Sequence, residues 1–132
     1  LCVCVCVCVC VCVFHRHDSL VVFDVLEDGA LVGPLAHVPT GRHPRNFNID
    51  PSGQWLLVGN AHDDNVAVYK ISPDTGVPVS TGEMIAVPTP TRILFTAPQR
   101  LTVSAGTGGA GLASTATVVH SGGTTVHVAT ES

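Results

Sequence analysis

Two small groups of ionisable side chains have types and spacings that could support chemistry. His17 stands directly before Asp18; histidine titrates near neutral pH, and a neighbouring carboxylate can fix which ring nitrogen carries the proton. The pair could therefore act as a general base or contact a substrate. Arg45 offers a planar guanidinium that could bind a phosphate or a carboxylate through two parallel hydrogen bonds. Structural roles stay open, because Asp18 could end a turn and Arg45 could brace a loop through backbone carbonyls.

Several other kinds of site find no support in the sequence. There is no phosphate-binding or dinucleotide-binding glycine pattern, no HExxH, and no Gly-x-Ser-x-Gly elbow. The six cysteines occupy every second position from Cys2 to Cys12, which is neither metal-binding C-x-x-C spacing nor a disulfide framework spread through a fold. The net charge is −4 with no basic cluster, so a nucleic-acid partner is not expected. We expect chemistry without metal or cofactor.

An internal repeat indicates which elements carry the candidate residues. The segment Asp18-Ser-Leu-Val-Val-Phe-Asp-Val25 recurs 46 residues later as Asp64-Asn-Val-Ala-Val-Tyr-Lys-Ile71. Each copy leads to a Val-Pro-Thr, at 38–40 and at 87–89, so the period is 46 to 49 residues. Periods in this range are typical of propeller blades, each a small four-stranded antiparallel sheet.

The predicted strands amount to one complete blade with parts of its two neighbours. Trp55 and Leu57 point to one side of their strand and Leu56 and Val58 to the other, so both faces are apolar and the sheet must lie between two others. The complete blade has strands at 46–50, 54–59, 65–71 and 83–87; strands at 19–25 and 35–38 form the outer half of the preceding blade, and 91–96 forms the inner strand of the next.

Composition divides the chain into three regions. Residues 1–13 are a low-complexity Cys-Val tract, which a simple TG dinucleotide repeat would encode, and 14–96 are the partial propeller. Residues 97–132 are rich in Gly, Ser, Thr and Ala, so coil is the default expectation, although 115–119 and 124–128 could pair as a weak hairpin. His43, Asn60 and His62 are expected to be loop residues.

The ends of the chain suggest an incomplete protein. It opens with Leu1 rather than methionine, and its apolar opening run is too short to cross a bilayer and lacks the features of a secretory signal. We therefore expect no membrane partner and no targeting segment. Fewer than two blades cannot close a ring, so the missing blades should come from the rest of a parent chain, and the isolated chain should be marginally stable.

Five strings stand in order along the chain: His17-Asp-Ser-Leu-Val-Val-Phe23, Pro44-Arg-Asn-Phe-Asn-Ile-Asp-Pro-Ser-Gly53, Trp55-Leu-Leu-Val-Gly-Asn60, Asp64-Asn-Val-Ala-Val-Tyr69 and Pro88-Thr-Pro-Thr-Arg-Ile-Leu-Phe95. Together they resemble the closing blades of the lactonase family that contains bacterial 6-phosphogluconolactonase. The resemblance covers about 80 residues. It implies an all-β fold, a partial propeller of about two of seven blades, and a cytoplasmic, cofactor-free hydrolase that opens 6-phospho-D-glucono-1,5-lactone in the pentose phosphate pathway.

The resemblance also bears on individual site residues. The family pattern before the first strand looks like Ser-Asn-Arg-Gly-His-Asp-Ser, and this sequence matches from His17 onward, with Arg16 at the glycine position. Lactone opening needs a base and a positive group, so we predict His17 and Asp18 as catalytic and Arg45 and Arg16 as substrate-binding. Two alternatives remain: a carboxymuconate-cyclising enzyme of the same fold, and a propeller remnant that is a binding module or has no activity.

Overall fold

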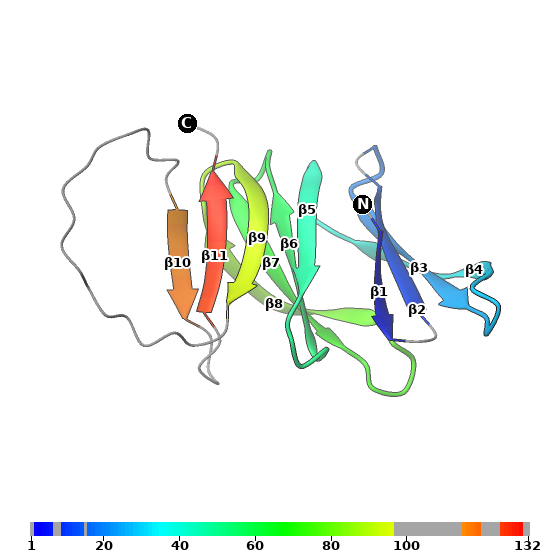
Figure 1. Ribbon diagram of the computed structural model, residues 1–132. Helices are drawn as coiled ribbons and strands as arrows, with labels where there is room; N and C mark the ends of the chain where they lie inside the picture. Colours follow the sequence, from blue (N-terminus) through cyan, green and yellow to red (C-terminus); the bar gives the residue numbers. More distant parts are fainter. Residues whose placement is uncertain (1, 7–8, 15, 97–114, 120–124, 131–132) are drawn as a thin grey trace.

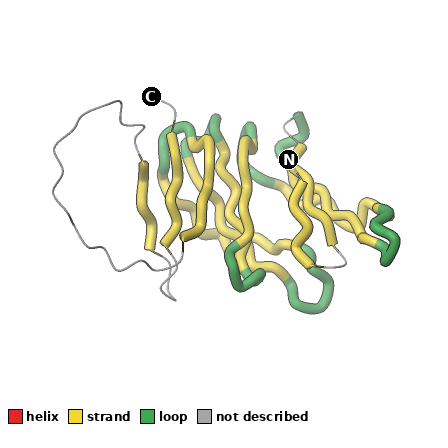
Figure 2. Tube along the Cα trace, viewed as in Figure 1, coloured by secondary structure: helices red, strands yellow, loops and turns green. Residues whose placement is uncertain are grey.

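The computed structural model describes residues 2–6, 9–14, 16–96, 115–119 and 125–130, and within them strands are joined by turns without any helix (Figures 1 and 2). Three sheets lie side by side, with the middle sheet between the other two (Figure 1). The all-β prediction and the partial propeller are confirmed.

The middle sheet is the complete blade that the sequence predicts. Its strands follow in chain order: β5 (Pro44–Ile49), β6 (Trp55–Asn60), β7 (Asn65–Ile71) and β8 (Pro78–Ala86). The strand β8 begins five residues earlier than predicted, since Gly82, at φ +80°, lies in a stretch where the register with β7 shifts. A bulge lets a strand continue through residues that otherwise resemble a turn.

The first sheet also has four strands, of which the sequence predicted two. Its order is β1 (Cys2–Cys6), β2 (Val9–Phe14), β3 (Ser19–Val25) and β4 (Leu31–Pro39). The two copies of the internal repeat are therefore β3 and β7, and each is the third strand of its sheet, as a blade repeat requires.

The Cys-Val tract supplies the two inner strands of the first sheet. The strands β1 and β2 pair with Cys2 opposite Cys12 and Cys4 opposite Cys10, and β2 pairs along its length with β3. Val11 is completely buried and Val13 nearly so, while Cys12 is disulfide-bonded. Because side chains alternate between the two faces of a strand, the valines of a Cys-Val repeat all lie on one face. A low-complexity repeat can therefore still supply an apolar face to a core.

Two hydrophobic clusters show that the middle sheet is buried on both faces. Leu56 and Val58 pack in the cluster toward the first sheet, with Leu20 and Val22 of β3. Leu57 packs in the opposite cluster with residues of β7 and β9. The prediction that β6 is apolar on both sides and lies between neighbouring sheets is confirmed.

The third sheet has the order β10-β11-β9, formed by β9 (Pro90–Thr96), β10 (Thr115–Val119) and β11 (Thr125–Thr130). The strands β10 and β11 pair as an antiparallel hairpin, which is the alternative that the sequence offered for this part of the tail. In addition, β11 pairs with β9. Val128 of β11 is completely buried in the second cluster. Residues 97–114, expected to be coil, lie outside the described residues. No helix in the described part of the chain has the length and apolarity needed to cross a membrane.

Candidate functional site at the loop end of the blades

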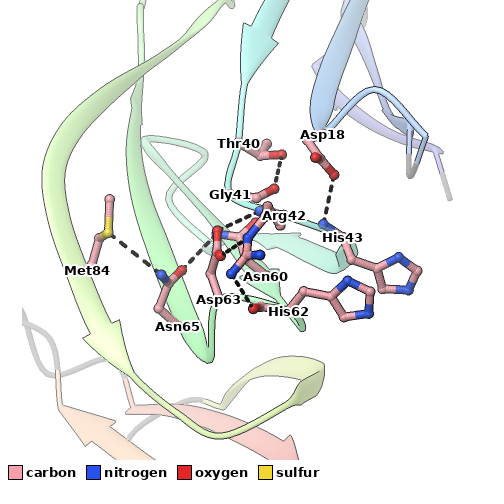
Figure 3. A network of polar contacts seen from close by, with 10 residues as sticks. All are labelled: Asp18, Thr40, Gly41, Arg42, His43, Asn60, His62, Asp63, Asn65 and Met84. Carbon is pink, nitrogen blue, oxygen red and sulfur yellow. Dashed lines mark hydrogen bonds and ion pairs between the residues drawn. The ribbon is translucent and has the colours of Figure 1, made fainter.

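The turns before β3, β5, β7 and β9 lie at one end of the sheets. The pairing fixes this arrangement, because Ser19 lies opposite Pro39, Pro44 opposite Asn60, and Asn65 opposite both Asn60 and Ala86. We call this end the loop end. The connections β4–β5 and β6–β7 meet there and bring together polar side chains from separate parts of the sequence (Figure 3).

Two histidine side chains stack at the loop end. His43 immediately precedes β5, and His62 lies between β6 and β7; their ring centroids are 4.4 Å apart and their planes differ by 13° (Figure 3). The backbone supports this approach, because the Ala61 N–H donates to the His43 carbonyl at 3.0 Å. His43 is half-buried and His62 is exposed. Imidazoles that solvent can reach are candidates for proton transfer to and from a bound substrate.

An arginine–aspartate pair braces the same two loops. The Arg42 Nε donates to Asp63 Oδ1 at 2.6 Å, and the Arg42 backbone N–H donates to Asp63 Oδ2 at 2.7 Å. A further bond joins the Arg42 guanidinium to the His62 carbonyl at 3.1 Å. The hydrogen bonds from Arg42 lower the pKa of Asp63, and the hydrogen bond to Asp63 raises the pKa of Arg42. Both side chains are therefore charged at neutral pH, and Arg42 fixes the loop that carries His62.

A groove lies beside this brace, along β4 and the outer strands of the middle sheet. Its volume is about 680 Å³, and its walls include Gly41, Asn60, Asp63, Tyr69 and Met84. Asn60 is buried and donates to Asn65 at 2.9 Å, and its Oδ1 has no hydrogen-bond partner within the described residues. The Tyr69 hydroxyl donates to the Pro39 carbonyl at 2.9 Å, and burial raises its pKa.

The structure separates His17 from Asp18. The exposed ring of His17 lies 6.0 Å from the ring of Phe14 and lines a groove of about 460 Å³ with Val21 and Phe23. Because Leu20 and Val22 face the middle sheet, this groove lies on the opposite face of the first sheet. The Asp18 carboxylate instead accepts the backbone N–H of His43 at 2.8 Å. The His17 ring and the Asp18 carboxylate therefore point to different parts of the molecule and do not form a pair. Their catalytic role stays a prediction.

The two predicted arginines lie at the loop end on different elements. Arg45 is exposed on β5, two residues after His43, at the point where the register with β6 shifts between Pro44 and Asn46. A bulge of this kind re-aims a side chain. Arg16 is exposed in the turn between β2 and β3. Arg45 therefore lies on the strand that His43 precedes, whereas Arg16 lies in the turn before β3.

Sequence reasoning placed His43 and His62 in loops and missed their pairing and the brace of Arg42 and Asp63. A signal was available, because positions 43 and 62 each lie three residues outside the strands expected at 46–50 and 54–59, at the same open end of one hairpin. Among the residues whose placement is described, no group of three or more histidine, cysteine or acidic side chains could hold a metal ion.

Comparison with known proteins gives matches over much of the chain. A 6-phosphogluconolactonase from Formosa agariphila is 43% identical over 62 residues, covering 46% of this chain and 18% of that protein. A crystal structure of a protein from Bacteroides uniformis matches with a TM-score of 0.61 and 34% identity, covering 64% of this chain and 25% of the other. The periplasmic gluconolactonase of Pseudomonas aeruginosa matches with a TM-score of 0.59 and 25% identity, covering 64% and 24%.

These matches cover only part of each relative. The chain spans less than a fifth of the curated relative's length and about a quarter of each solved structure. The model of the family described as "Lactonase, 7-bladed beta-propeller" matches residues 7–95, which include the whole middle sheet and the loop-end residues. The chain therefore belongs to the seven-bladed β-propeller lactonase family.

Proposed function

We propose that the protein of which this chain is a part hydrolyses 6-phospho-D-glucono-1,5-lactone to 6-phosphogluconate. The observation that supports this proposal is the stacked pair of His43 and His62 beside the first residue of the inner strand β5. Arg45 follows as the second residue of that strand. This arrangement lies inside the region that matches the lactonase family, and a relative named 6-phosphogluconolactonase shares 43% identity over 62 residues.

Hydrolysis of a lactone requires a proton acceptor and a positively charged group. Water attacks the lactone carbonyl carbon, and a neutral imidazole of the pair accepts the proton that water loses. The carbonyl oxygen gains negative charge in the tetrahedral intermediate, which a positive or hydrogen-bonding group stabilises. The ring C–O bond then breaks, and the leaving oxygen takes up a proton to give the hydroxy acid. Arg45 would bind the phosphate, since guanidinium matches phosphate geometry.

The experiment is hydrolysis by the full-length protein compared with the spontaneous rate. We expect His62→Gln to lower kcat by about 10²- to 10⁴-fold, the usual contribution of a general base. Arg45→Ala should raise KM with a smaller effect on kcat. His17→Gln tests the first sequence prediction and should leave the rate nearly unchanged if His43 and His62 are the proton acceptors. A wild-type rate no faster than the spontaneous one would refute the proposal, and turnover of a muconate alone would favour the cyclising alternative.

The proposal extends to the chain's setting in the cell. We propose that the missing blades come from the rest of the parent chain, that this chain alone is inactive, and that the protein acts in the cytoplasm in the pentose phosphate pathway. One structural relative is named a periplasmic gluconolactonase. Cell fractionation with an antibody against the native protein separates the two compartments, and assay of this chain alone tests its inactivity.

A further inference from the structure

The two Asp residues that precede β3 and β7 adopt the same unusual backbone. Asp18 has φ +47° and Asp64 has φ +49°, in the left-handed region that aspartate tolerates better than most residues. The Asp18 carbonyl accepts the Thr40 N–H at 2.8 Å, and the Asp64 carbonyl accepts the Val87 N–H at 3.0 Å. Each Asp thus ties the start of a third strand to the end of the fourth strand in the same blade.

Their carboxylates make a second link, which leads into the next blade. Asp18 Oδ1 accepts the His43 N–H at 2.8 Å, and Asp64 Oδ1 accepts the Thr89 N–H at 2.8 Å. Both donors stand 25 residues after their Asp and directly before the proline that opens an inner strand. The same hydrogen bond therefore recurs with the 46-residue period of the blades.

The two donor residues also have an unfavourable backbone conformation. His43 has φ +54° and Thr89 has φ +39°. A residue before proline is restricted to extended conformations, and a left-handed β-branched residue such as Thr89 is a genuine outlier. Such conformations persist only where the surroundings hold them. A carboxylate that accepts the backbone N–H is a strong, charge-assisted restraint of that kind.

The two links differ in what they hold in place. The side chain at the first is an imidazole that stacks on His62 at 4.4 Å; at the second it is Thr89, whose hydroxyl lies 3.5 Å from the same Asp64 oxygen. We propose that Asp18 is a positioning residue, which holds the His43 backbone so that its ring stacks on His62, and that Asp64 is its structural equivalent without a histidine to position. The inference concerns the site of the proposed function, but it rests on the geometry and not on lactone turnover.

The test is NMR of the full-length protein with ¹³C-labelled histidine, using His43→Gln and His62→Gln to assign the two signals. The wild-type protein should show a nuclear Overhauser effect between ring protons of His43 and His62, which we call the ring contact. Asp18→Ala should abolish this contact, and Asp18→Asn, which keeps an oxygen acceptor at the same distance, should preserve it. The matched control Asp64→Ala removes the equivalent link in the next blade and should leave the contact unchanged.

Two outcomes would overturn the proposal: persistence of the ring contact in Asp18→Ala, or its equal loss in Asp64→Ala. If Asp18→Ala does not fold, Asp18→Glu decides, because the longer side chain keeps the charge but displaces the oxygen. It should shift the His43 signal and weaken the ring contact, while Asp64→Glu leaves both unchanged; an unshifted His43 signal in Asp18→Glu overturns the proposal. These readouts do not depend on whether the protein hydrolyses a lactone.

Discussion

Single residues at the loop end are held by close, specific contacts rather than by the general burial of the sheets. Gly41 illustrates this, because a Cβ atom there would lie 2.7 Å from Cγ and Nδ2 of Asn60 and from an oxygen of Asp63. Asn60 is buried and bonded to Asn65, so it has little room to move. The conformation of the loop that carries Arg42 and His43 therefore requires glycine at position 41 as well as the loop's hydrogen bonds.

We predict that Gly41→Ala lowers the free energy of unfolding of the full-length protein by about 1–3 kcal/mol, the usual cost of overpacking. In an Asn60→Ala background the same change should cost less, because two of the three clashing atoms are gone. Gly53→Ala, at a position with nothing within 4 Å, should add independently to Asn60→Ala. Urea unfolding of the single and double variants measures the coupling of Gly41→Ala to Asn60→Ala and that of Gly53→Ala to Asn60→Ala. Equal costs of Gly41→Ala in the two backgrounds would contradict this packing.

At the scale of elements, the first three strands of the middle sheet, β5, β6 and β7, pack against neighbouring sheets, whereas the outer strand β8 is mostly exposed. Alternation along β6 sends Leu56 to one cluster and Leu57 to the other. The second cluster also includes β11, which comes from the Gly- and Thr-rich tail and contributes the completely buried Val128. A segment with the composition of a linker thus completes a core once a neighbouring strand offers it an edge.

We predict that Val128→Ala destabilises the full-length protein by about 1–3 kcal/mol, between the usual costs of removing one methyl group and of truncating a buried leucine. Val79→Ala is the matched control, since Val79 is 59% exposed and should change stability by no more than about 0.5 kcal/mol. Chemical denaturation of both variants measures the difference. A neutral Val128→Ala would mean that β11 does not pack on β9 in solution.

At the scale of the molecule, the first sheet has one face packed on the middle sheet and one that is not covered by another described sheet. That second face carries the groove lined by Phe14, Val21 and Phe23, and Phe14 is 49% exposed. Apolar surface left in water costs roughly 25 cal/mol per Å², and the net stability of a whole domain is only about 5–15 kcal/mol. An uncovered apolar face therefore weighs heavily on the stability of this chain.

We predict that this chain alone self-associates and binds a hydrophobic dye, whereas the full-length protein does neither. Size-exclusion chromatography and dye fluorescence at equal concentrations make the comparison. A longer chain that includes one further upstream blade should still bind dye, because adding a blade moves the uncovered face without removing it. A monomeric, dye-free and cooperatively unfolding single chain would show that its blades need no neighbour.

The sequence by itself determined the blade repeat, the third-strand position of both repeat copies, and the double-sided burial of β6, because alternation and period are local properties of the chain. Only the tertiary structure decided that the Cys-Val tract forms β1 and β2, that His17 and Asp18 face different surroundings, and that His43 meets His62. These outcomes depend on which strands pair and which turns meet at one end. Residues adjacent in sequence can then be directed apart, while residues 19 apart come into contact.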